Sequence, residues 1–470
     1  MTPNISQEFT SQIPSYVREG MNLLHRKGYE AYLVGGAVRD ILLGGTPADY
    51  DLASDATPEQ MLEVFGDQHT IPTGMKHGTI TVVMDGHPLQ VTTYRVDGAY
   101  SDQRRPDRVT YSRSLEEDVK RRDFTINALA MDVSGRVLDY VDGRRDLSTR
   151  IIRCVGDPDL RMKEDALRIL RALRFSSVLG FEVESQTRHS LSRNKNLLTK
   201  VSSERVLSEM NCLLCGADVE KVLLRYFDVL AVILPEILPM QGFEQHNPHH
   251  IYDVWTHTAR VVGNTPPDAA IRWAALFHDS GKPAAFTLDE TGIGHFYGHP
   301  KISCDLANAA LLRLRADTKT RERVETLVLY HDAEIEPVAK IVRRRLCRFG
   351  EPVFRDLLAI KRADTLAQSD KSHYRLAEID QVTSLLDTVL ADRACFSLRD
   401  LAINGEDVMS AGIPSGPLVG AILREILRQV IDETVPNEKE DLLILVTFLH
   451  NNMPVLFTND SQNGQNGLFS

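Results

Sequence analysis

The sequence predicts an α+β fold, with a small mixed or antiparallel sheet in the N-terminal part and an all-helical remainder. Short segments rich in Val, Thr and Tyr, separated by Gly and Asp turns, fill the first 150 residues, as is typical of strands. From about residue 158 the apolar residues recur at helical spacing instead. At 470 residues the chain is too long for one core, so we expect several domains.

The expected elements follow from these patterns. The expected strands are 31–34, 50–53, 79–84, 88–95, 128–132 and 137–141. The expected helices are 163–179, 185–193, 203–215, 219–234, 252–263, 268–278, 302–315, 320–331, 338–348, 351–368 and 374–391, with helical spacing continuing to about residue 450. The final segment, 458–470, is polar and rich in Gly and Asn, so we expect it to be disordered.

Composition narrows the class of protein. Hydrophobic residues make up 43% and charged residues 25%, which is ordinary for a globular protein. No apolar run approaches the ~20 residues that cross a bilayer, and the N-terminus has neither the basic nor the apolar region of a secretion signal. The six cysteines are scattered, which fits a reducing compartment. We therefore expect a cytoplasmic protein with no membrane partner; nothing in the sequence sets its oligomeric state.

The charge distribution allows oriented contact with a polyanion. The net charge of −11 argues against indiscriminate nucleic-acid binding. Basic residues nevertheless gather in residues 101–174 and 339–362, the second of which includes Arg343, Arg344 and Arg345. An acidic protein with basic stripes can bind RNA in one orientation, although a solvated helix face explains 339–362 equally well.

The most informative motif is a pair of acids that follows a pair of glycines. Asp49 and Asp51 follow Gly35 and Gly36 in LVGGAVRDILLGGTPADYDLA. Side chains alternate along a strand, so the two carboxylates share a face and raise each other's pKa, a penalty that bound Mg²⁺ removes. The glycines let backbone N–H groups approach a phosphate. Either motif alone is usually a turn or a solvated acidic loop, but together they indicate metal-dependent nucleotidyl transfer.

This combination resembles the signature of the DNA polymerase beta-type nucleotidyltransferases. Proteins with that signature often carry a third carboxylate on a later strand. The matching strand here is HPLQVTTYR, with Gln90 where an acid might stand. An amide can orient a ligand but contributes no charge, so we expect two metal-binding carboxylates.

Two basic segments extend the candidate site. The loop 97–111 can contact phosphates, although it is also compatible with an ordinary surface loop. Its arginines are Arg104, Arg105 and Arg108. In the segment 114–132, Arg122 and Asp123 end a capped helix and Asn127 leads into a strand. An Arg beside an Asp near a phosphate cradle can contact triphosphate and ribose hydroxyls.

A later helix offers groups for base recognition. In GDPDLRMKEDALRILRALRF, Glu164 or Asp165 lies three or four residues before Arg168, so they are neighbours on a helix. A surface salt bridge is the simplest explanation. A carboxylate and a guanidinium held side by side can also offer an acceptor and a donor to a base edge.

The ordered set of motifs resembles the class II tRNA nucleotidyltransferases, the CCA-adding enzymes. The motifs are GGAVRD, DYDLASDATPE, GTITVVMDG, VTTYRVDGAYSDQRRPD, LEEDVKRRDFTINALAMD and EDALRILRALRF, and LRDLAINGEDVMSAGIPSGPLVG resembles the family's tail. The resemblance implies a catalytic head (1–150), a helical neck (151–238), a helical body (239–370), a tRNA-binding tail (371–457) and the disordered terminus 458–470.

The resemblance also implies ligands and roles. CTP and ATP would be the donors, Mg²⁺ the metal, and the 3′ end of tRNA the acceptor, with the acceptor and elbow regions held by the protein. Asp49 and Asp51 would bind metal, Asp165 and Arg168 would read the incoming base, and the remaining residues would bind the nucleotide. These are Gly35, Gly36, Arg39, Arg122, Asp123, Asn127, Arg171 and Arg174.

Related activities remain open at this stage. A poly(A) polymerase usually carries a basic Arg-Arg-Phe element after the acidic strand, and VFGDQHTIPTGMKHGTI lacks one. Enzymes that add only CC are usually shortened in the loop 97–111, which is complete here. Full CCA addition is favoured, and addition of A alone stays an alternative.

The helical part carries a second set of groups. These are His257, His278, Asp279, His299, His331 and Asp364. A lone His on an apolar helix is usually structural, but this ordered set resembles the HD superfamily of metal-dependent phosphohydrolases. The resemblance implies that the helical body, 239–370, is a domain of the HD type. Imidazoles with carboxylates suit a divalent metal, whose identity the sequence does not define. Lys282 could contact a phosphate. Two hypotheses therefore compete with a nucleotidyltransferase: a primary phosphohydrolase and a non-catalytic RNA-binding protein. The transferase residues argue against both, because Asp49, Asp51, Asp165 and Arg168 are intact.

Overall fold

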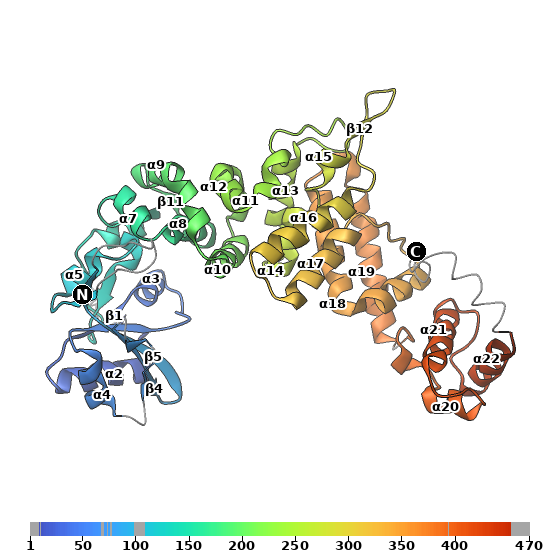
Figure 1. Cartoon of the computed structure of the whole chain (residues 1–470), viewed down its shortest axis with the longest axis horizontal. Helices are drawn as coiled ribbons and strands as arrows, with labels where there is room; N and C mark the ends of the chain where they lie inside the picture. Colours follow the sequence, from blue (N-terminus) through green and yellow to red (C-terminus); the bar gives the residue numbers. More distant parts are fainter. Residues whose placement is uncertain are drawn as a thin grey trace, which may run out of the picture. The chain divides into compact units, whose positions relative to one another are not determined.

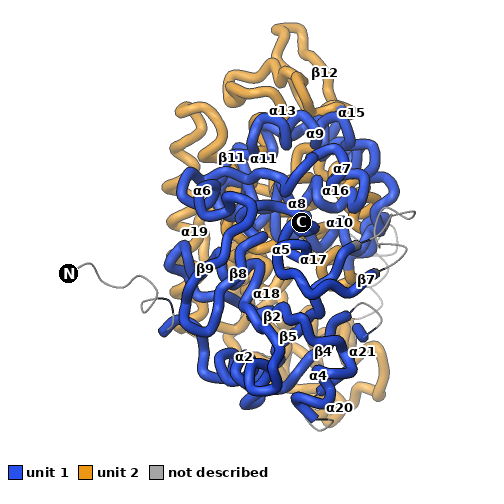
Figure 2. Tube along the Cα trace, turned by 90° about the vertical axis from the view of Figure 1, so that its left-hand side faces the viewer, with its two compact units in different colours: residues 1–238, 313–316 blue, residues 239–312, 317–470 orange. Residues whose placement is uncertain are grey.

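The computed structural model describes residues 9, 11–66, 70–72, 74–75, 78–97, 109–392 and 394–452. The chain divides into two compact units, residues 1–238 with 313–316 and residues 239–312 with 317–470 (Figure 2). The division at residue 238 coincides with the predicted end of the neck, whereas the predicted boundaries at 150 and 370 fall inside the units and stay predictions. The segment 458–470 and the loop residues Arg104, Arg105 and Arg108 lie outside the described residues.

A seven-stranded mixed sheet forms the base of the first unit and confirms the predicted fold class. Its strands are β1 (Ala31–Val34), β2 (Asp51–Ser54), β3 (Thr70–Ile71), β4 (Thr79–Met84), β5 (His87–Thr93), β8 (Leu129–Met131) and β9 (Val137–Asp139). They lie in the order β3-β4-β5-β2-β1-β8-β9; β2 and β5 are parallel and the other neighbouring pairs are antiparallel. The predicted strands match these within one or two residues, except that β3 is not predicted.

Helices pack against the sheet and shape the segments that lead to the site. They are α2 (Ser15–Arg26), α3 (Gly36–Leu42), α4 (Pro58–Phe65), α5 (Leu115–Lys120), η3 (Thr125–Asn127) and α6 (Gly143–Ser148). Val17, Met21 and Leu24 of α2 are fully buried, and α2 packs with α4 against the sheet (Figure 1). A capping box between Thr57 and Gln60, with Pro58 in the first turn, fixes where α4 begins.

Three two-stranded sheets are not predicted from the sequence, because each of their strands has only two or three residues. They are β6 (Arg95–Asp97) with β7 (Val109–Tyr111), β10 (Ile151–Ile152) with β11 (Glu182–Val183), and β12 (Thr287–Leu288) with β13 (Gly294–His295). Strands this short give too few residues for an alternating pattern to be read.

The neck is helical as predicted, but the predicted helix 163–179 is wrong at its start. Its elements are α7 (Pro158–Glu164), α8 (Leu167–Leu179), α9 (Ser185–Asn194), η4 (Lys195–Lys200), α10 (Ser203–Leu214), α11 (Val219–Arg225), α12 (Phe227–Ile233) and η5 (Pro235–Met240). Asp165 adopts an extended conformation (φ −140°, ψ 103°) between α7 and α8. Its Oδ1 accepts a hydrogen bond from the backbone N–H of Leu167 at 3.1 Å, so the carboxylate begins a new helix. The predicted helix 219–234 is likewise interrupted, at Tyr226.

The second unit begins with a helical body. Its helices are α13 (Val254–Asn264), α14 (Ala269–Phe277), α15 (Lys282–Ala285), α16 (His299–Arg313), α17 (Thr318–Tyr330), α18 (Ala339–Leu366), η6 (Asp370–Ser372) and α19 (Arg375–Ala391). Trp273, Phe277 and Phe354 are among its largest fully buried side chains. Gly350 (φ 71°, ψ 162°) kinks α18 just before Pro352, which confirms the two helical stretches predicted on either side of residue 350.

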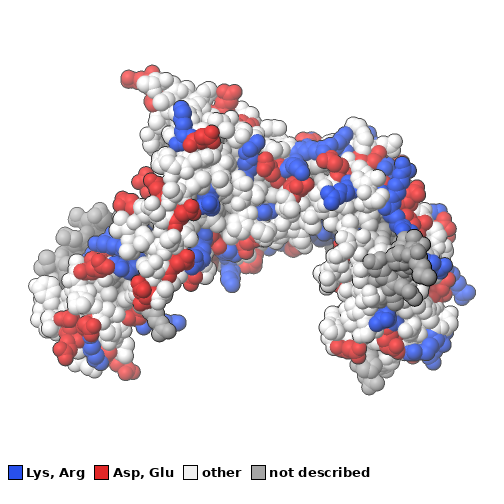
Figure 3. Space-filling view, turned by 180° about the vertical axis from the view of Figure 1, so that it is seen from behind, with Lys and Arg blue, Asp and Glu red and all other residues white. Residues whose placement is uncertain are grey.

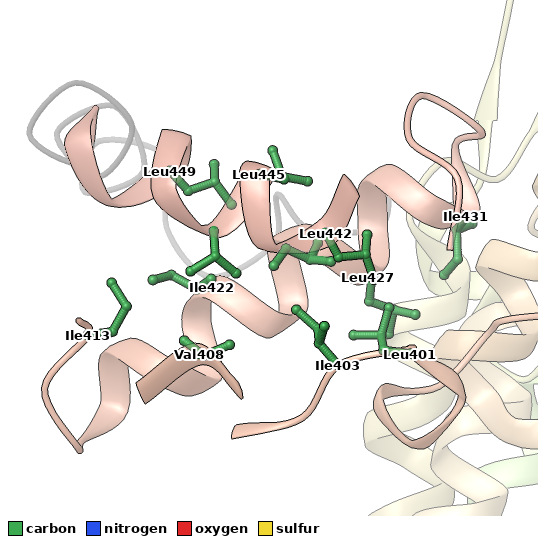
Figure 4. Close-up of a cluster of buried hydrophobic side chains, with 12 residues drawn as sticks. Leu401, Ile403, Val408, Ile413, Ile422, Leu427, Ile431, Leu442, Leu445 and Leu449 are labelled. Carbon is green, nitrogen blue, oxygen red and sulfur yellow. The ribbon is translucent and has the colours of Figure 1, made fainter. Parts of the chain in front are cut away.

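The C-terminal helices of the second unit have a core of their own. They are η7 (Leu398–Asp400), α20 (Gly405–Ser410), α21 (Pro417–Ile431) and α22 (Lys439–Asn451). Figure 4 shows side chains of α21, among them Ile422 and Leu427, gathered with Leu442 and Leu449 of α22, and Val408 of α20 belongs to the same buried cluster. This cluster gives the predicted tail a hydrophobic interior.

No helix in the described ranges is long and apolar enough to cross a bilayer. The cytoplasmic location stays a prediction.

Candidate active site and candidate metal centre

A polar cavity of about 490 Å³ in the first unit gathers the predicted transferase residues. All of them line it: Gly35, Gly36, Arg39, Asp49, Asp51, Arg122, Asp123, Asn127, Asp165, Arg168, Arg171 and Arg174. Four lining residues are not predicted from the sequence: Arg121, Leu167, Phe175 and Arg205. The wall combines two acids on the sheet side with many guanidinium groups, so it suits a multiply charged anion that brings its own cation.

The glycine pair leaves room for two arginine side chains. Gly35 joins β1 to α3 with φ 74° and ψ −135°, a conformation that favours glycine. A Cβ at Gly35 would lie 3.3 Å from Nη1 of Arg122, and one at Gly36 would lie 3.4 Å from Nη2 of Arg39. Glycine at both positions therefore brings two guanidinium groups close to the backbone at the start of α3.

Side-chain partners fix both guanidinium groups. Nη1 of Arg39 donates to Oδ1 of Asn127 at 2.8 Å, and its Nε donates to Asp40 at 2.8 Å. Nη2 of Arg122 lies 3.1 Å from Oδ2 of Asp118. Burial alone would raise the pKa of Asp118, but Arg121 and Arg122 outweigh it and hold that pKa below its usual range. The two arginines are thus preorganised beside the glycines.

The carboxylate pair shows the electrostatic penalty that the sequence predicts. Asp51 begins β2, and Asp49 lies two residues before it. Burial, and secondly the charge of Asp49, raise the pKa of Asp51, while Arg122 lowers it only in part. Gln90 lies opposite Asp51 on the parallel strand β5, so the position considered for a third acid is indeed adjacent to the pair. An uncompensated pair of acids in a cavity fits a divalent cation.

Asp123 is held by an ion pair with a neck helix. Its Oδ2 accepts from Nη2 of Arg171 at 2.5 Å and from Nε at 2.8 Å, while its Oδ1 accepts from the N–H of Phe124. Burial would raise the pKa of Asp123, but Arg171 outweighs it and the pKa is lowered. Nε of Arg174 in turn donates to Glu209 at 2.6 Å. The expected ribose contact of Asp123 stays a prediction.

Asp165 and Arg168 both line the cavity, and each has a strong partner. Nη1 of Arg168 donates to Glu164 at 2.6 Å, which is the neighbouring acid expected from the spacing. Nη2 of Arg205 donates to Oδ2 of Asp165 at 2.8 Å. Arg205 is the functional candidate that sequence reasoning misses. One feature of the sequence could have pointed to it. Arg205 lies four residues before Glu209 on α10, so the two side chains share a face of that helix, and Glu209 accepts a hydrogen bond from Arg174 of the cavity.

The second unit brings the predicted HD residues into one buried cluster. They lie at the ends of α14, α16 and α17 and within α13 and α18. Oδ2 of Asp279 lies 3.4 Å from Nε2 of His257 and 3.2 Å from Nε2 of His278. Its Oδ1 lies 3.3 Å from Nε2 of His299 and 3.7 Å from Nε2 of His331. Asp279 therefore lies between two groups of potential metal ligands, as a bridging carboxylate would.

Asp364 of α18 completes the cluster, with Oδ1 at 2.9 Å from Nε2 of His257. His278 is the other histidine beside it, at 3.9 Å. All the predicted residues of this second site are thus brought together, while their role stays a prediction.

All four histidines present the same nitrogen to the cluster. Their Nδ1 atoms lie 2.7 to 3.4 Å from backbone carbonyl oxygens, to which each can donate. With the proton on Nδ1, the lone pair of Nε2 points inward, which is the tautomer that ligates metals. Nε2 of His257 and Nε2 of His278 are buried and make no hydrogen bond of good geometry with a described residue. These orphaned atoms fit a metal ion.

Lys282 makes contacts inside the cluster, and its predicted phosphate contact stays a prediction. Its Nζ lies 2.7 Å from Oδ2 of Asp279 and 2.9 Å from Oε1 of Gln245, and the residue is only 5% exposed. Burial raises the pKa of Asp279, but His278 and Lys282 outweigh it and leave that pKa well below its usual range. Lys282 is thus engaged with Asp279 and Gln245, and it is also one of the residues that line a neighbouring cavity. A cavity of about 340 Å³ opens above the cluster.

The basic stripe 339–362 is largely neutralised inside the second unit. Nη2 of Arg344 lies 2.8 Å from Asp432, and Arg343 pairs with Glu433. Figure 3 likewise shows basic and acidic side chains interspersed over the visible face. The geometry therefore favours the alternative of an ordinary charged helix face over an RNA-binding stripe.

Three family models match parts of this chain. The family model of the poly(A) polymerase head domain matches residues 31–153, and that of the probable RNA- and SrmB-binding site of polymerase A matches residues 180–240. A third model, the putative domain 2 of tRNA nucleotidyltransferase, matches residues 299–446.

Relatives and solved structures agree over nearly the whole length. The CCA-adding enzyme of Levilactobacillus brevis is 34% identical over 430 residues, covering 92% of this chain and 96% of that one. The CCA-adding enzyme of Geobacillus kaustophilus is 36% identical over 428 residues, covering 89% and 92%. The crystal structure of the Bacillus stearothermophilus CCA-adding enzyme in complex with CTP is 30% identical, with a TM-score of 0.67 over 93% and 98% of the two chains.

The head and the site define a nucleotidyltransferase of the poly(A) polymerase type. The chain belongs to the family of CCA-adding enzymes. Divalent-metal dependence is general in that class.

Proposed function

We propose that this chain builds or repairs the 3′-terminal CCA of tRNA, using CTP and ATP as donors. One observation carries the proposal: a single cavity gathers the glycine pair, the two acids and the Asp165–Arg168 pair. The similarity to CCA-adding enzymes over most of the chain supports full CCA addition over addition of A alone or of poly(A).

Asp49 and Asp51 would hold Mg²⁺, and the raised pKa of Asp51 supports this assignment because a bound cation removes the repulsion. When bound, Mg²⁺ would activate the 3′-hydroxyl of the tRNA and neutralise charge on the departing pyrophosphate. The two acids would hold the cation beside the α-phosphate. The 3′-hydroxyl would attack that phosphorus in line, the bond to the β-phosphate would break, and pyrophosphate would leave as the chain grows by one nucleotide.

The residues beside the acids would bind the triphosphate. The N–H groups that follow β1 approach the phosphates through Gly35 and Gly36, and Arg39 and Arg122 supply fixed positive charge. Asp123, already ordered by Arg171, together with Asn127 would contact the ribose hydroxyls and phosphates. Arg171 and Arg174 add positive charge on the neck side of the cavity.

Asp165 and Arg168 would choose the base. Cytosine and adenine both present an amino donor beside a ring-nitrogen acceptor, whereas uracil and guanine present a carbonyl oxygen and an N–H at those positions. A carboxylate that accepts and a guanidinium that donates match the first pair and leave the second pair unsatisfied. A wrong base is therefore rejected because buried polar groups would remain unpaired.

Removal of both carboxylates tests the proposal. The double variant Asp49→Ala, Asp51→Ala should lose nucleotide incorporation, measured on a tRNA transcript that lacks CCA, while retaining tRNA binding in a filter assay. The variant Asp85→Asn, in an exposed turn that does not line the cavity, is the matched control. Incorporation that survives the double substitution would contradict the assignment.

A second function is supported by the buried cluster of the second unit. We infer that His257, His278, Asp279 and Asp364 hold one divalent ion and that Asp279, His299 and His331 can hold another. The common inward orientation of Nε2 supports this. When bound, the metal would supply an activated water for hydrolysis of a phosphoester, and the open cavity above it would admit the substrate.

Metal content tests this second function separately from the first. The purified full chain should carry up to two equivalents of divalent metal beyond the transferase site, measured by mass spectrometry after Mg²⁺ is removed. Asp279→Asn should lose that metal and any hydrolysis of p-nitrophenyl phosphate. A metal content unchanged by Asp279→Asn would exclude the site.

A further inference from the structure

We propose that Arg205 is a specificity-determining positioning residue, which holds the Asp165 carboxylate in the orientation that selects cytosine and adenine. This inference rests on the proposed base selection by Asp165. Arg205 lies on α10, lines the same cavity, and reaches back to an acid 40 residues earlier in the chain.

Asp165 needs such a partner because its own conformation does not fix its carboxylate. The residue lies at the break between α7 and α8, outside any helix. The last torsion of an Asp side chain has a broad minimum, so rotation of the carboxylate plane is easy. The hydrogen bond from the N–H of Leu167 holds Oδ1 at 3.1 Å, and the bond from Arg205 holds Oδ2 at 2.8 Å. Two points of attachment define the plane, which leaves the remaining lone pairs aimed at a bound base.

The helix that carries Arg205 is itself firmly placed. Met210, Leu213 and Leu214 of α10 are fully buried, and α10 packs along α8. One turn after Arg205, Glu209 accepts from Nε of Arg174 at 2.6 Å. The same helix therefore braces an acceptor and a donor of the cavity wall. The ion pair between Arg205 and Asp165 is mostly shielded, with the side chains 25% and 18% exposed.

Orientation of this carboxylate decides which bases are accepted. A carboxylate turned out of the plane of the base loses its bond from the amino group of cytosine or adenine. Its repulsion of the carbonyl oxygen of uracil or guanine weakens at the same time. Loss of Arg205 should therefore reduce the discrimination between correct and wrong nucleotides and leave the chemistry at Asp49 and Asp51 intact.

The test compares nucleotides in the full-length protein. The ratio of kcat/KM for CTP against UTP is measured on a tRNA transcript lacking CCA, and for ATP against GTP on one ending in CC. Arg205→Ala should lower both ratios about tenfold, mainly through a higher KM for CTP and ATP. Arg205→Lys should restore most of the ratio, because a single N–H donor makes the observed bond. Arg193→Ala, which breaks a similar ion pair with Asp159 outside this cavity, should leave both ratios unchanged.

The outcomes separate this inference from the proposed function. Ratios unchanged in Arg205→Ala, or an equal loss of kcat for all four nucleotides, would overturn the positioning role. Should Arg205→Ala melt earlier than wild type, Arg205→Gln, which keeps part of the aliphatic stem but is too short to reach Asp165 as Arg205 does, takes its place with the same expectations. Asp165→Asn addresses the underlying proposal: unchanged ratios in that variant would refute base selection by Asp165 itself. Altered ratios in Asp165→Asn with unchanged ratios in Arg205→Ala would refute the present inference alone.

Discussion

Substitution of Asp51 by Asn should stabilise the metal-free protein while abolishing nucleotide incorporation. Asp51 is half-buried beside Asp49, and its desolvation and the charge of Asp49 both raise its pKa in the folded state. Alternate residues of an extended chain lie about 6.6 Å apart, so two unit charges repel by about 2.5 kcal/mol at an effective dielectric constant of ~20. Solvent at the exposed Asp49 and the charge of Arg122 reduce this to about 1 kcal/mol. Removing that penalty should raise Tm by about 2–4 °C.

The pH dependence of this gain has a defined sign. Because the pKa of Asp51 is higher in the folded than in the unfolded state, the folded state binds the proton more tightly, and stability falls as pH rises through the folded pKa. The Tm advantage of Asp51→Asn should therefore be complete at neutral pH and shrink toward pH 4.

Calorimetry measures the Tm of three proteins with and without Mg²⁺. They are the wild type, Asp51→Asn and the exposed control Asp85→Asn. Mg²⁺ should raise the Tm of the wild type and of Asp85→Asn but have little effect on Asp51→Asn. A metal-free Asp51→Asn that melts below wild type, or an equal Mg²⁺ shift in all three proteins, would refute the reasoning.

Three further outcomes follow from the structure. Gly35→Ala should cost about 1 kcal/mol of stability and raise the KM for CTP severalfold, because its φ is 74° and the new Cβ would crowd Arg122; steady-state kinetics and thermal melts check this. Ile426→Ala, in the core of the tail, should lower the local free energy of unfolding by about 2–4 kcal/mol, seen as faster hydrogen exchange in α20–α22. Arg344→Ala should leave the salt dependence of tRNA binding unchanged, since Arg344 pairs with Asp432; a flatter slope would restore the RNA-binding interpretation of the stripe.

The predictions that the structure confirms depend on residues that lie close together in the sequence. The glycine pair, the acids at Asp49 and Asp51 and the strand before them follow from local spacing, because a strand and a turn fix relative positions over a few residues. The position of Gln90 beside Asp51 is also confirmed, since the apolar pattern sets the register of β5. The ordered histidines of the second unit are brought together because each lies at or near the end of a helix of one buried bundle.

The features that sequence reasoning misses depend on contacts between distant elements. The pairing of Arg205 with Asp165 joins α10 to the break between α7 and α8, and no local pattern ties one residue to the other. The break at Asp165 requires an extended residue within an otherwise helical pattern, which periodicity cannot show. The burial of Lys282 and the neutralisation of Arg344 likewise depend on which acids the fold brings beside them.

Addition to defined tRNA ends tests the central claim most directly. Three transcripts, ending before CCA, after C and after CC, are incubated with the purified protein and Mg²⁺ and given CTP and ATP singly and together. The structure and the family predict that all three are extended to a complete CCA end, with CTP required for the first two and ATP for the last nucleotide. Adenosine added only to the CC-ended transcript, long A tracts, or no extension of any transcript would contradict the account.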